Sequence, residues 1–468
     1  MTTTTDAPAR FTGRQRMTVI LLLGAGFMLS VDYSILNVAL PRLGAGVGLA
    51  PSELPWVVSA FALPAAGFTL LFGRIADMYG RRRLFLIGVT LLALSSLVGA
   101  MATNPTMLLT ARVLQGFATA IATPAALALL VTSFSDEKQR ARVLGLNGAL
   151  LSGGFTVGAL VGGTLVGVLS WRWAFLINVP VAVLILVATP FLVRASSAPA
   201  GVRLDVPGAV TVTLGLLAFV FGVINENVYS LLGGVALLVI FWMIERRARA
   251  PLAAVDILTR PTIKWGNVAG LVVFAMEPGA IFLMTLYLQD VLHFAPLTTG
   301  LIFGVPGLAS VVAGVVAGRF IAKYGPRKVL AVGLLGQAAF TAPLIALGTG
   351  QVWLSVLIPA LFFGFFAHVT AIVSFMVTAT TGLPDSEQGL ATGLATLTQQ
   401  VGITIGVPIL SAVMTTQAVM LDGLHLALGV NVLITVVATV LIWIGLRPRI
   451  QPAAGDAGAR DTLEASAG

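Results

Sequence analysis

Fourteen apolar runs govern what this chain can fold into, because most of them are long enough to cross a membrane as a helix. A helix of about 20 residues spans a hydrocarbon core of roughly 30 Å. The sequence therefore predicts an all-α integral membrane protein with 14 transmembrane helices, embedded in a lipid bilayer. The expected spans are 17–40, 54–73, 83–102, 106–131, 143–168, 174–193, 206–224, 229–244, 266–289, 297–318, 328–348, 352–380, 388–413 and 424–446.

The distribution of basic residues sets the orientation of these spans. Only 10% of the residues are charged, whereas soluble domains carry about 25%. With the N-terminus inside, 24 of the 27 Lys and Arg residues fall in inner loops and tails, two fall in outer loops, and Arg112 lies within a span. This bias predicts cytoplasmic termini and a multi-pass protein of the cytoplasmic (inner) membrane. Short basic loops form no phosphate-binding face, so no nucleic-acid partner is expected.

Several kinds of chemistry are not expected from this chain. It has no cysteine, which excludes disulfides, thiolate catalysis and cysteine metal sites. Its histidines, His293, His368 and His425, are scattered, so no metal site is expected. There is no nucleophile constellation and no phosphate-binding loop, and we expect neither an enzyme nor a bound cofactor. A cleaved signal peptide is the alternative for 17–40, but that run is too long for one.

An internal repeat divides the chain into related halves. The segment Gly73–Arg83 reads GRIADMYGRRR, and Gly318–Lys328 reads GRFIAKYGPRK, 245 positions later. A second shared pattern links the glycines that follow Gly145 to those that follow Gly393, at an offset of 248. Such repeats are typical of transporters. Helices 1–6 therefore correspond to helices 9–14, with two helices inserted between them.

The repeat predicts five parts of the chain, and the two tails are expected to be disordered because they are rich in small and charged residues. The parts are a cytoplasmic N-terminal tail (1–16), an N-terminal six-helix half (17–193), two inserted helices with cytoplasmic linkers (194–265), a C-terminal six-helix half (266–446) and a cytoplasmic C-terminal tail (447–468).

Two opposite charges lie within the N-terminal half. Charges inside a bilayer are costly, and Asp32 and Arg112 lie about 12 Å and about 9 Å from the outer ends of their helices at 1.5 Å per residue. One interpretation is a structural ion pair that ties the first helix to the fourth. The other is a proton-coupling pair, in which the Asp32 carboxylate exchanges a proton when Arg112 moves. Gln115, one turn from Arg112, can hydrogen-bond in the same cluster.

Glu277 is a third charge at membrane depth, near the middle of the ninth helix. The neighbouring Pro278 and Gly279 are expected to break that helix, and broken helices near the midplane are typical of transporter binding sites. Proton coupling or cation binding is one interpretation, and a protonated acid hydrogen-bonded in the core is the other. His368, in the twelfth helix, is either a satisfied core residue or a relay.

The first basic turn contains a single acid, Asp77, at the inner end of the second helix. An acid among arginines suggests an ion-pair lock that opens with the inner mouth, so the predicted gate is Gly73, Asp77, Gly80, Arg81 and Arg82. The alternative for the arginines is that they only follow the positive-inside bias.

Three glycines of the fifth helix, Gly154, Gly158 and Gly162, repeat at intervals of four. Close helix packing is the simplest interpretation of this spacing. The same glycines could instead mark where the two halves rock against each other.

Four motifs together resemble the major facilitator superfamily, and in particular its fourteen-helix drug:proton antiporters. Gly73–Arg83 resembles the loop motif between helices 2 and 3, and Asp32–Pro41 resembles the helix 1 motif of the fourteen-helix group. Arg112–Gly116 resembles the helix 4 motif linked to proton coupling, and Trp171–Pro180 resembles a marker of the same group. The chain departs from the antiporter motif of helix 5 at Ala159, and Ala322 replaces the acid in the second basic turn.

The resemblance implies a proton-driven efflux transporter that exports amphipathic organic compounds, such as drugs or antibiotics, by alternating access. It supports proton coupling at Asp32 and Arg112 and a gate at Asp77, and it implies a functional monomer powered by the proton gradient. Glu277, from its depth alone, is the third expected proton-coupling residue. An uptake symporter or metabolite permease shares the same backbone features, and a non-transporting membrane sensor or assembly partner is the alternative of another class. The expected substrate cavity contains Asn37, Gln115, Glu277 and His368.

Overall fold

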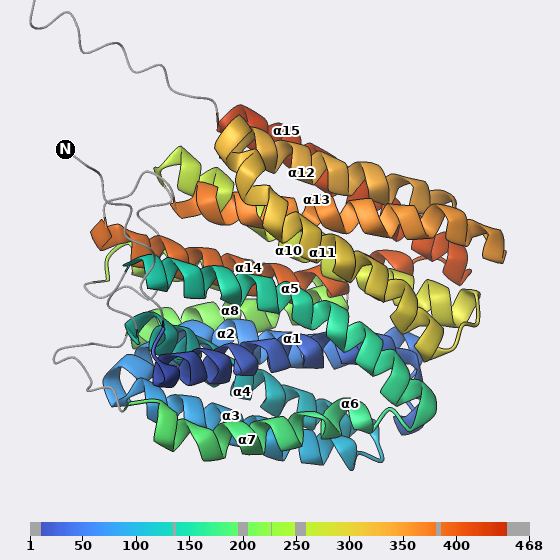
Figure 1. The fold of residues 1–468 in the computed structure, drawn as a ribbon. Helices are drawn as coiled ribbons and strands as arrows, with labels where there is room; N and C mark the ends of the chain where they lie inside the picture. The colour runs from blue at the N-terminus through green and yellow to red at the C-terminus, as the bar shows by residue number, and fades with distance from the viewer. Residues whose placement is uncertain are drawn as a thin grey trace, which may run out of the picture.

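The computed structural model describes residues 11–133, 137–194, 205–225, 227–248, 259–380 and 385–446. All regular structure in these ranges is helical, and the long helices run side by side (Figure 1). The predictions for residues 1–10 of the N-terminal tail, for the whole C-terminal tail (447–468) and for the linker residues 195–204 and 249–258 lie outside the described residues. The long helices are α1 (Gly13–Val47), α2 (Pro55–Tyr79), α3 (Arg81–Ala100), α4 (Pro105–Thr132), α5 (Glu137–Val168), α6 (Trp173–Leu176) with α7 (Asn178–Leu192), α8 (Val206–Ile224), α9 (Val228–Glu245), α10 (Pro261–Leu286), α11 (Pro296–Tyr324), α12 (Pro326–Thr341), α13 (Leu354–Thr380), α14 (Asp385–Met414) and α15 (Met420–Gly445).

The helices have the length and composition of membrane spans. Within the described residues, twelve are long and apolar enough to cross a membrane, or thirteen if the bent pair 51–69 and 71–79 of the α2 region is one span. Each predicted span overlaps a helix, and the all-α prediction for a multi-pass membrane protein is confirmed. The count of fourteen stays a prediction, because the part of α5 that could be assessed contains an apolar helical segment, Val157–Val168, that is too short to count as a span.

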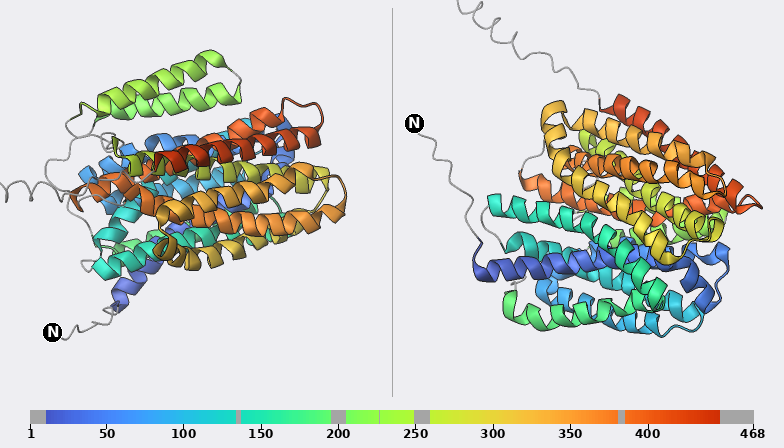
Figure 2. Two further views of the ribbon diagram at one scale, coloured as in Figure 1. Left: turned by 90° about the horizontal axis from the view of Figure 1, so that it is seen from above. Right: turned by 45° about the vertical axis from the view of Figure 1, so that its right-hand side comes forward.

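The helices fall into two groups of similar order with a hairpin between them. Figure 2 shows α8 and α9 as a hairpin on one side of the bundle. The helices α1–α7 precede it and α10–α15 follow it. The bounds of the two groups agree with the repeat, because α2 and α11 end 245 positions apart and α3 and α12 begin 245 positions apart.

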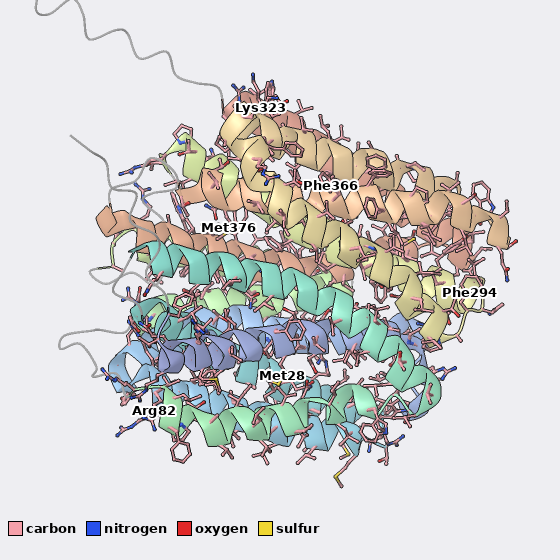
Figure 3. All side chains as sticks on the ribbon, viewed as in Figure 1. Met28, Arg82, Phe294, Lys323, Phe366 and Met376 are labelled. Atoms are coloured by element: carbon pink, nitrogen blue, oxygen red, sulfur yellow. The ribbon has the colours of Figure 1, made fainter. Side chains whose placement is uncertain are left out.

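Two glycines make the turns that define one end of the bundle. Gly80, between α2 and α3, has a φ of 104°, and Gly325, between α11 and α12, has a φ of 81°. Residues with a Cβ rarely adopt such angles, which accounts for a glycine at each turn. We call this end of the bundle the turn end, and the other the far end. Figure 3 shows Arg82 and Lys323 toward the turn end and Phe294 toward the far end.

Three helix boundaries differ from the expected ones. The first helix begins at Gly13, before the start of the predicted span 17–40, with a capping box between Thr12 and Gln15. The predicted break at Pro278 is wrong, since α10 runs through that residue without interruption and continues as the π-helix η3 (Tyr287–Val291). The predicted span 174–193 is divided at Ile177, so Asn178 begins α7.

The apolar core joins the two halves mainly at the far end. The largest of four clusters contains Leu40 and Leu43 of α1 together with Phe282 and Leu286 of α10. A second cluster belongs to the N-terminal half and a third to the C-terminal half. A fourth links α2, α8, α9, α10 and α14. The far end therefore holds the most extensive contact between the halves.

Candidate functional site

Asp32 and Arg112 form a buried ion pair inside the N-terminal half. Asp32 lies on α1 and Arg112 on α4, and their exposed fractions are 0% and 1%. The distance between Arg112 Nη1 and Asp32 Oδ2 is 3.5 Å. Fully buried charges are stable only when they are paired and hydrogen-bonded, so the surroundings of this pair decide what it can do.

Neighbouring groups hold the guanidinium of Arg112 in place. Its Nε donates to the Val57 carbonyl at 3.0 Å, and its Nη1 donates to Gln115 Oε1 at 2.8 Å. The Phe61 ring lies 4.4 Å from the guanidinium carbon, a cation–π distance. Val57 and Phe61 belong to α2, so Arg112 connects α1, α2 and α4.

Two further polar residues complete the cluster. The Asn178 amide donates to Asp32 Oδ1 and, at 3.3 Å, to Ser96 Oγ. Gln115 Nε2 donates to the same Ser96 oxygen at 3.0 Å. We call Asp32, Ser96, Arg112, Gln115 and Asn178 the Asp32 network. Two of its oxygens, Asp32 Oδ2 and Asn178 Oδ1, accept no hydrogen bond from the described residues.

Sequence reasoning missed Ser96 and Asn178 as members of this network. Asn178 lies in the Trp171–Pro180 motif, and its amide at the start of an apolar run was the available signal. Ser96 follows Ser95 in the third apolar run. Serine is common in membrane helices and hydrogen-bonds readily to its own backbone, so its side chain alone gave little indication of a site.

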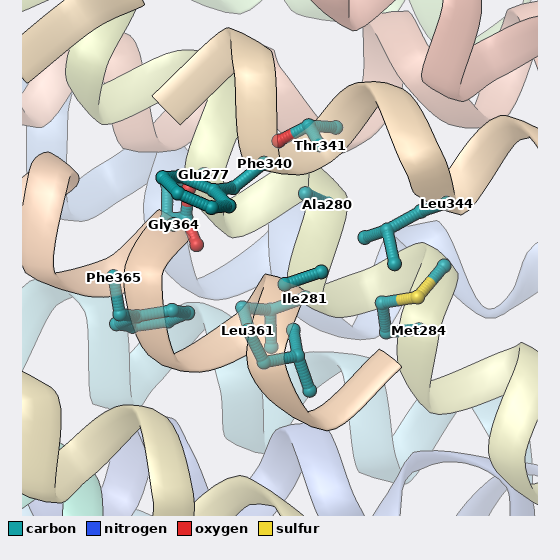
Figure 4. Close-up of a pocket in the computed structure, with 11 residues that line it drawn as sticks. Glu277, Ala280, Ile281, Met284, Phe340, Thr341, Leu344, Leu361, Gly364 and Phe365 are labelled. Carbon is teal, nitrogen blue, oxygen red and sulfur yellow. The ribbon is translucent and has the colours of Figure 1, made fainter. Parts of the chain in front are cut away.

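Glu277 lies apart from this network, in the C-terminal half. Its exposed fraction is 7%, and it has no hydrogen bond or ion pair with any described residue. It lines a small pocket between α10, α12 and α13, with a volume of about 10 Å³ (Figure 4). Such a volume holds one water molecule. We call this space the Glu277 pocket.

His368 and Asn37, both predicted in the substrate cavity, are buried at 8% and 3% exposure. The His368 ring is edge-on to Phe274 and Phe365, with centroids 6.5 and 5.8 Å away. Its Nδ1 has no hydrogen-bond partner among the described residues. Asn37 donates to the Tyr33 carbonyl at 2.9 Å, one turn back on α1. The structure places neither residue in the Asp32 network.

Asp77 forms an ion pair within the turn that contains it. The distance from Arg81 Nε to Asp77 Oδ1 is 2.8 Å, and the two side chains are 22% and 29% exposed. Gly73 faces α4, where an added Cβ would lie 3.5 Å from Pro124 Cβ. Arg82 is half-buried at the start of α3. These residues lie at the turn end and not beside the Asp32 network.

The glycines of α5 contact a helix of their own half. A Cβ on Gly154 would lie 2.7 Å from Ser30 Cβ, and one on Gly158 would lie 2.6 Å from the Val31 carbonyl oxygen. Gly162 is similarly close to the Cα of Ile35, at 2.9 Å. These three glycines let α5 approach α1 closely.

A different glycine pair makes the seam between the halves. A Cβ on Gly163 of α5 would lie 2.7 Å from the Pro296 carbonyl and 3.0 Å from the Gly300 Cα, both on α11. Nearer the turn end, Cβ atoms on Gly314 and Gly318 of α11 would meet no described atom within 4 Å. The two halves are therefore in close contact where the far ends of α5 and α11 meet.

Among the described residues, no three His, Asp or Glu side chains lie together in a group that could hold a metal ion.

The family of this chain can be identified from its sequence. The model of the Major Facilitator Superfamily matches residues 22–407 and 267–464. The chain belongs to the Major Facilitator Superfamily.

Relatives of this superfamily chain are named for resistance and export. It is 33% identical to the puromycin resistance protein pur8 of Streptomyces alboniger, over 93% of this chain and 92% of the relative. It is 34% identical to the cephamycin export protein CmcT of Amycolatopsis lactamdurans, over 84% of each chain. The lincomycin resistance protein of Streptomyces lincolnensis is 28% identical over 86% of this chain and 85% of its own.

Solved structures of transporters share the fold. An autoinhibited POT family peptide transporter gives a TM-score of 0.70 at 14% identity, over 94% of this chain and 98% of its own. The human organic anion transporter MFSD10 gives 0.65 at 16% identity, over 92% and 100%. At such identities the likeness shows the fold alone.

Proposed function

We propose that this protein is a proton-driven exporter of amphipathic organic compounds, such as antibiotics, that works by alternating access across the cytoplasmic membrane. The observation that carries the proposal is the fully buried pair of Asp32 and Arg112 in a member of this superfamily. The gradient of protons supplies the energy, and no bound cofactor is needed.

The geometry of the Asp32 network suits proton exchange. Arg112 is held by Val57 and Gln115, so its charge stays in place when Asp32 gains a proton. Asp32 Oδ2 has no other hydrogen-bond donor among the described residues and offers an oxygen to that proton. Protonation removes the attraction to Arg112 and loosens α1 from α4. A proton from outside thus changes the contact between two helices of one half.

The names of the relatives support export of organic compounds. The relatives with 33% and 34% identity are named for puromycin resistance and cephamycin export. Both matches cover more than four-fifths of the two chains. We infer that this chain also moves amphipathic organic compounds out of the cell.

The seam between the halves supports alternating access. The positive-inside bias places the turn end in the cytoplasm. Gly163 and Gly300 close the seam at the far end. We infer a conformation closed toward the outside, which the halves leave by rocking. The Asp77–Arg81 pair at the turn end is our candidate for the inner gate.

Transport in proteoliposomes tests this proposal. Purified protein is reconstituted in vesicles that contain a pH-sensitive dye, and a panel including puromycin and lincomycin is added. We expect some compounds to drive proton movement, and Asp32→Asn to stop it. Thr435→Val is the matched control, because Thr435 is a fully buried residue of α15 whose hydroxyl bonds only its own helix. Transport without proton movement, or movement of compounds only inward, would refute the proposal.

A further inference from the structure

One hydroxyl in the N-terminal half departs from the pattern that the other buried threonines follow. The described residues include thirteen buried threonines. Twelve of them donate their hydroxyl hydrogen to a backbone carbonyl, usually four positions back in the same helix. The exception is Thr119 of α4, which is 7% exposed and whose Oγ1 has no hydrogen-bond partner among the described residues. A buried polar group of this kind is normally satisfied by an ordered water molecule.

Thr119 lies on the face of α4 that carries the arginine of the Asp32 network. Thr119 follows Arg112 by seven positions, and Thr123 follows Arg112 by eleven. At 3.6 residues per turn, both threonines return to within about 20° of the direction of Arg112. The rise of 1.5 Å per residue places them about 10 Å and about 16 Å closer to the turn end. One face of α4 thus leads from the Asp32 network toward the turn end.

The hydroxyl of Thr123 is open as well. Its Oγ1 is buried and makes no hydrogen bond with the described residues. Pro124 follows within the helix and has no amide hydrogen to give to the carbonyl of Ala120, four positions back. The hydroxyls of Thr119 and Thr123 and this carbonyl therefore form a series of polar groups that lack the usual hydrogen bonds within a helix. We call this series the α4 path.

The spacing of the α4 path suits single water molecules. Side chains four positions apart on a helix have Cβ atoms about 5–6 Å apart, and two hydrogen bonds through one water span about the same distance. Gln115, Thr119 and Thr123 follow one another at intervals of four, and Gln115 belongs to the Asp32 network. Exposure rises along α4, from 7% at Thr119 to half-buried at Thr123 and exposed at Thr132. The path thus begins beside the network and opens toward the turn end.

We propose that the α4 path holds a row of water molecules that carries the proton of Asp32 to the cytoplasm, with Thr119 and Thr123 as positioning residues. This inference rests on the proposed function and adds the route by which the proton leaves. The proton passes from Asp32, whose Oδ2 accepts no hydrogen bond from the described residues, to the first water. Each water then gives one of its own protons to the next, and the last gives a proton to the cytoplasm.

The transfer balances and needs no other reactant. Asp32 loses one proton and becomes a carboxylate, the cytoplasm gains one proton, and the waters and hydroxyls end as they began. A threonine hydroxyl suits this role because it donates one hydrogen bond and accepts others, so it can hold a water on each side.

Silver ions test whether water reaches the α4 path. The chain has no cysteine, so Thr119→Cys and Thr123→Cys each carry a single thiol in the purified full-length protein. Silver is a soft cation of about the size of a water molecule and binds thiolates. The thiols left unreacted are counted with N-ethylmaleimide after denaturation. Thr435→Cys is the matched control, because Thr435 is fully buried on α15 and its hydroxyl bonds only the Asn431 carbonyl.

We expect both path thiols to react with silver at least about tenfold faster than the control, because a thiol buried in apolar surroundings is inert. A thiol at position 119 that reacts no faster than the control overturns the inference. A thiol that reacts at position 123 but not at position 119 also overturns it, because the water then stops short of the network.

The rate of proton release tests whether the path carries protons. A compound that drives proton movement in vesicles is mixed by stopped flow with weakly buffered protein in detergent, and a pH-sensitive dye follows the release. We expect Thr119→Val to slow the release about tenfold, the effect of one hydrogen bond lost in the transition state. The amount should stay at about one proton per protein, because Asp32 is unchanged. Thr119→Ser restores a hydroxyl and should return the rate to within about threefold of the wild type.

An equally slow release by Thr119→Ser would show that the shape of the side chain matters and not its hydroxyl, and the inference fails. If Thr119→Val does not fold, Thr123→Val gives the same comparison. Proton release by the wild type at a rate that a folded valine variant leaves unchanged refutes only this inference. A wild type that releases no proton refutes the proposed function, and the silver reaction then still decides whether the α4 path holds water.

Discussion

Replacing Arg112 by methionine should destabilise the protein strongly, because it leaves the carboxylate of Asp32 buried without its cation. The structure gives the size of the effect. Arg112 is 1% exposed, lies 3.5 Å from Asp32, and donates hydrogen bonds to Val57 and Gln115. Removing one partner of a buried ion pair costs about 3–5 kcal/mol. We expect a loss of that size in the free energy of unfolding, measured by titration with a denaturing detergent in mixed micelles.

A double-mutant cycle separates the ion pair from the lost packing. In the variant with both Arg112→Met and Asp32→Asn, no charge is left unpaired, so we expect a coupling energy of about 1–3 kcal/mol. Arg172→Met is a matched control. Arg172 also donates to a carbonyl, that of Ala102 at 3.2 Å, and also lies over an aromatic ring, that of Trp171 at 4.4 Å. Its loss should cost about 1 kcal/mol. Effects of Arg112 and Asp32 that add within about 0.5 kcal/mol would refute the reasoning.

The turns and the glycine contacts give three more predictions. Gly80→Ala should lower the unfolding free energy by about 1–3 kcal/mol, because a residue with a Cβ is strained at the φ of 104° that Gly80 adopts. Unchanged stability in the same micelles would argue against this turn. Asp77→Asn removes a partly exposed ion pair and should lower the unfolding free energy by less than about 1 kcal/mol. It should nevertheless reduce the turnover of export in vesicles while the apparent affinity for the compound stays unchanged. A loss of affinity alone would count against a gate. Gly158→Leu should lower the unfolding free energy by about 1–3 kcal/mol or more, because the new side chain would contact Val31. Gly153→Leu is the control and should have little effect, because a Cβ at Gly153 meets no described atom within 4 Å. Equal losses of stability would contradict the α1–α5 packing.

Much of the fold could be predicted from the sequence. In a membrane, a long apolar run can satisfy the hydrogen bonds of its backbone only in a closed structure such as a helix. The acids and the arginine were also accessible, since a charge in an apolar run is costly and conspicuous. Asp32 and Arg112 were expected to pair, and the structure brings them together. Neutral polar groups give a weaker signal: Gln115 was expected only because it lies one turn from Arg112, and Asn178 and Ser96 were missed.

The continuity of α10 depends on its neighbours and was not accessible from its own residues. Pro278 lacks an amide hydrogen, which suggested a break. Surrounding helices can supply hydrogen bonds to such a region. Here the Asn431 amide of α15 donates to the Met276 carbonyl at 2.7 Å, beside the proline. Asn431 lies 155 positions away from Met276 in the chain, so no local sequence pattern could predict this hydrogen bond.

Proton release by the purified protein tests the central claim, that Asp32 exchanges a proton when a compound binds. A compound that drives proton movement in vesicles is added to weakly buffered protein in detergent, and the pH change is converted to protons per protein. We predict release of about one proton by the wild type and by Thr435→Val, and none by Asp32→Asn, since an amide has no acidic proton to exchange. Equal release by Asp32→Asn and the wild type would contradict the account.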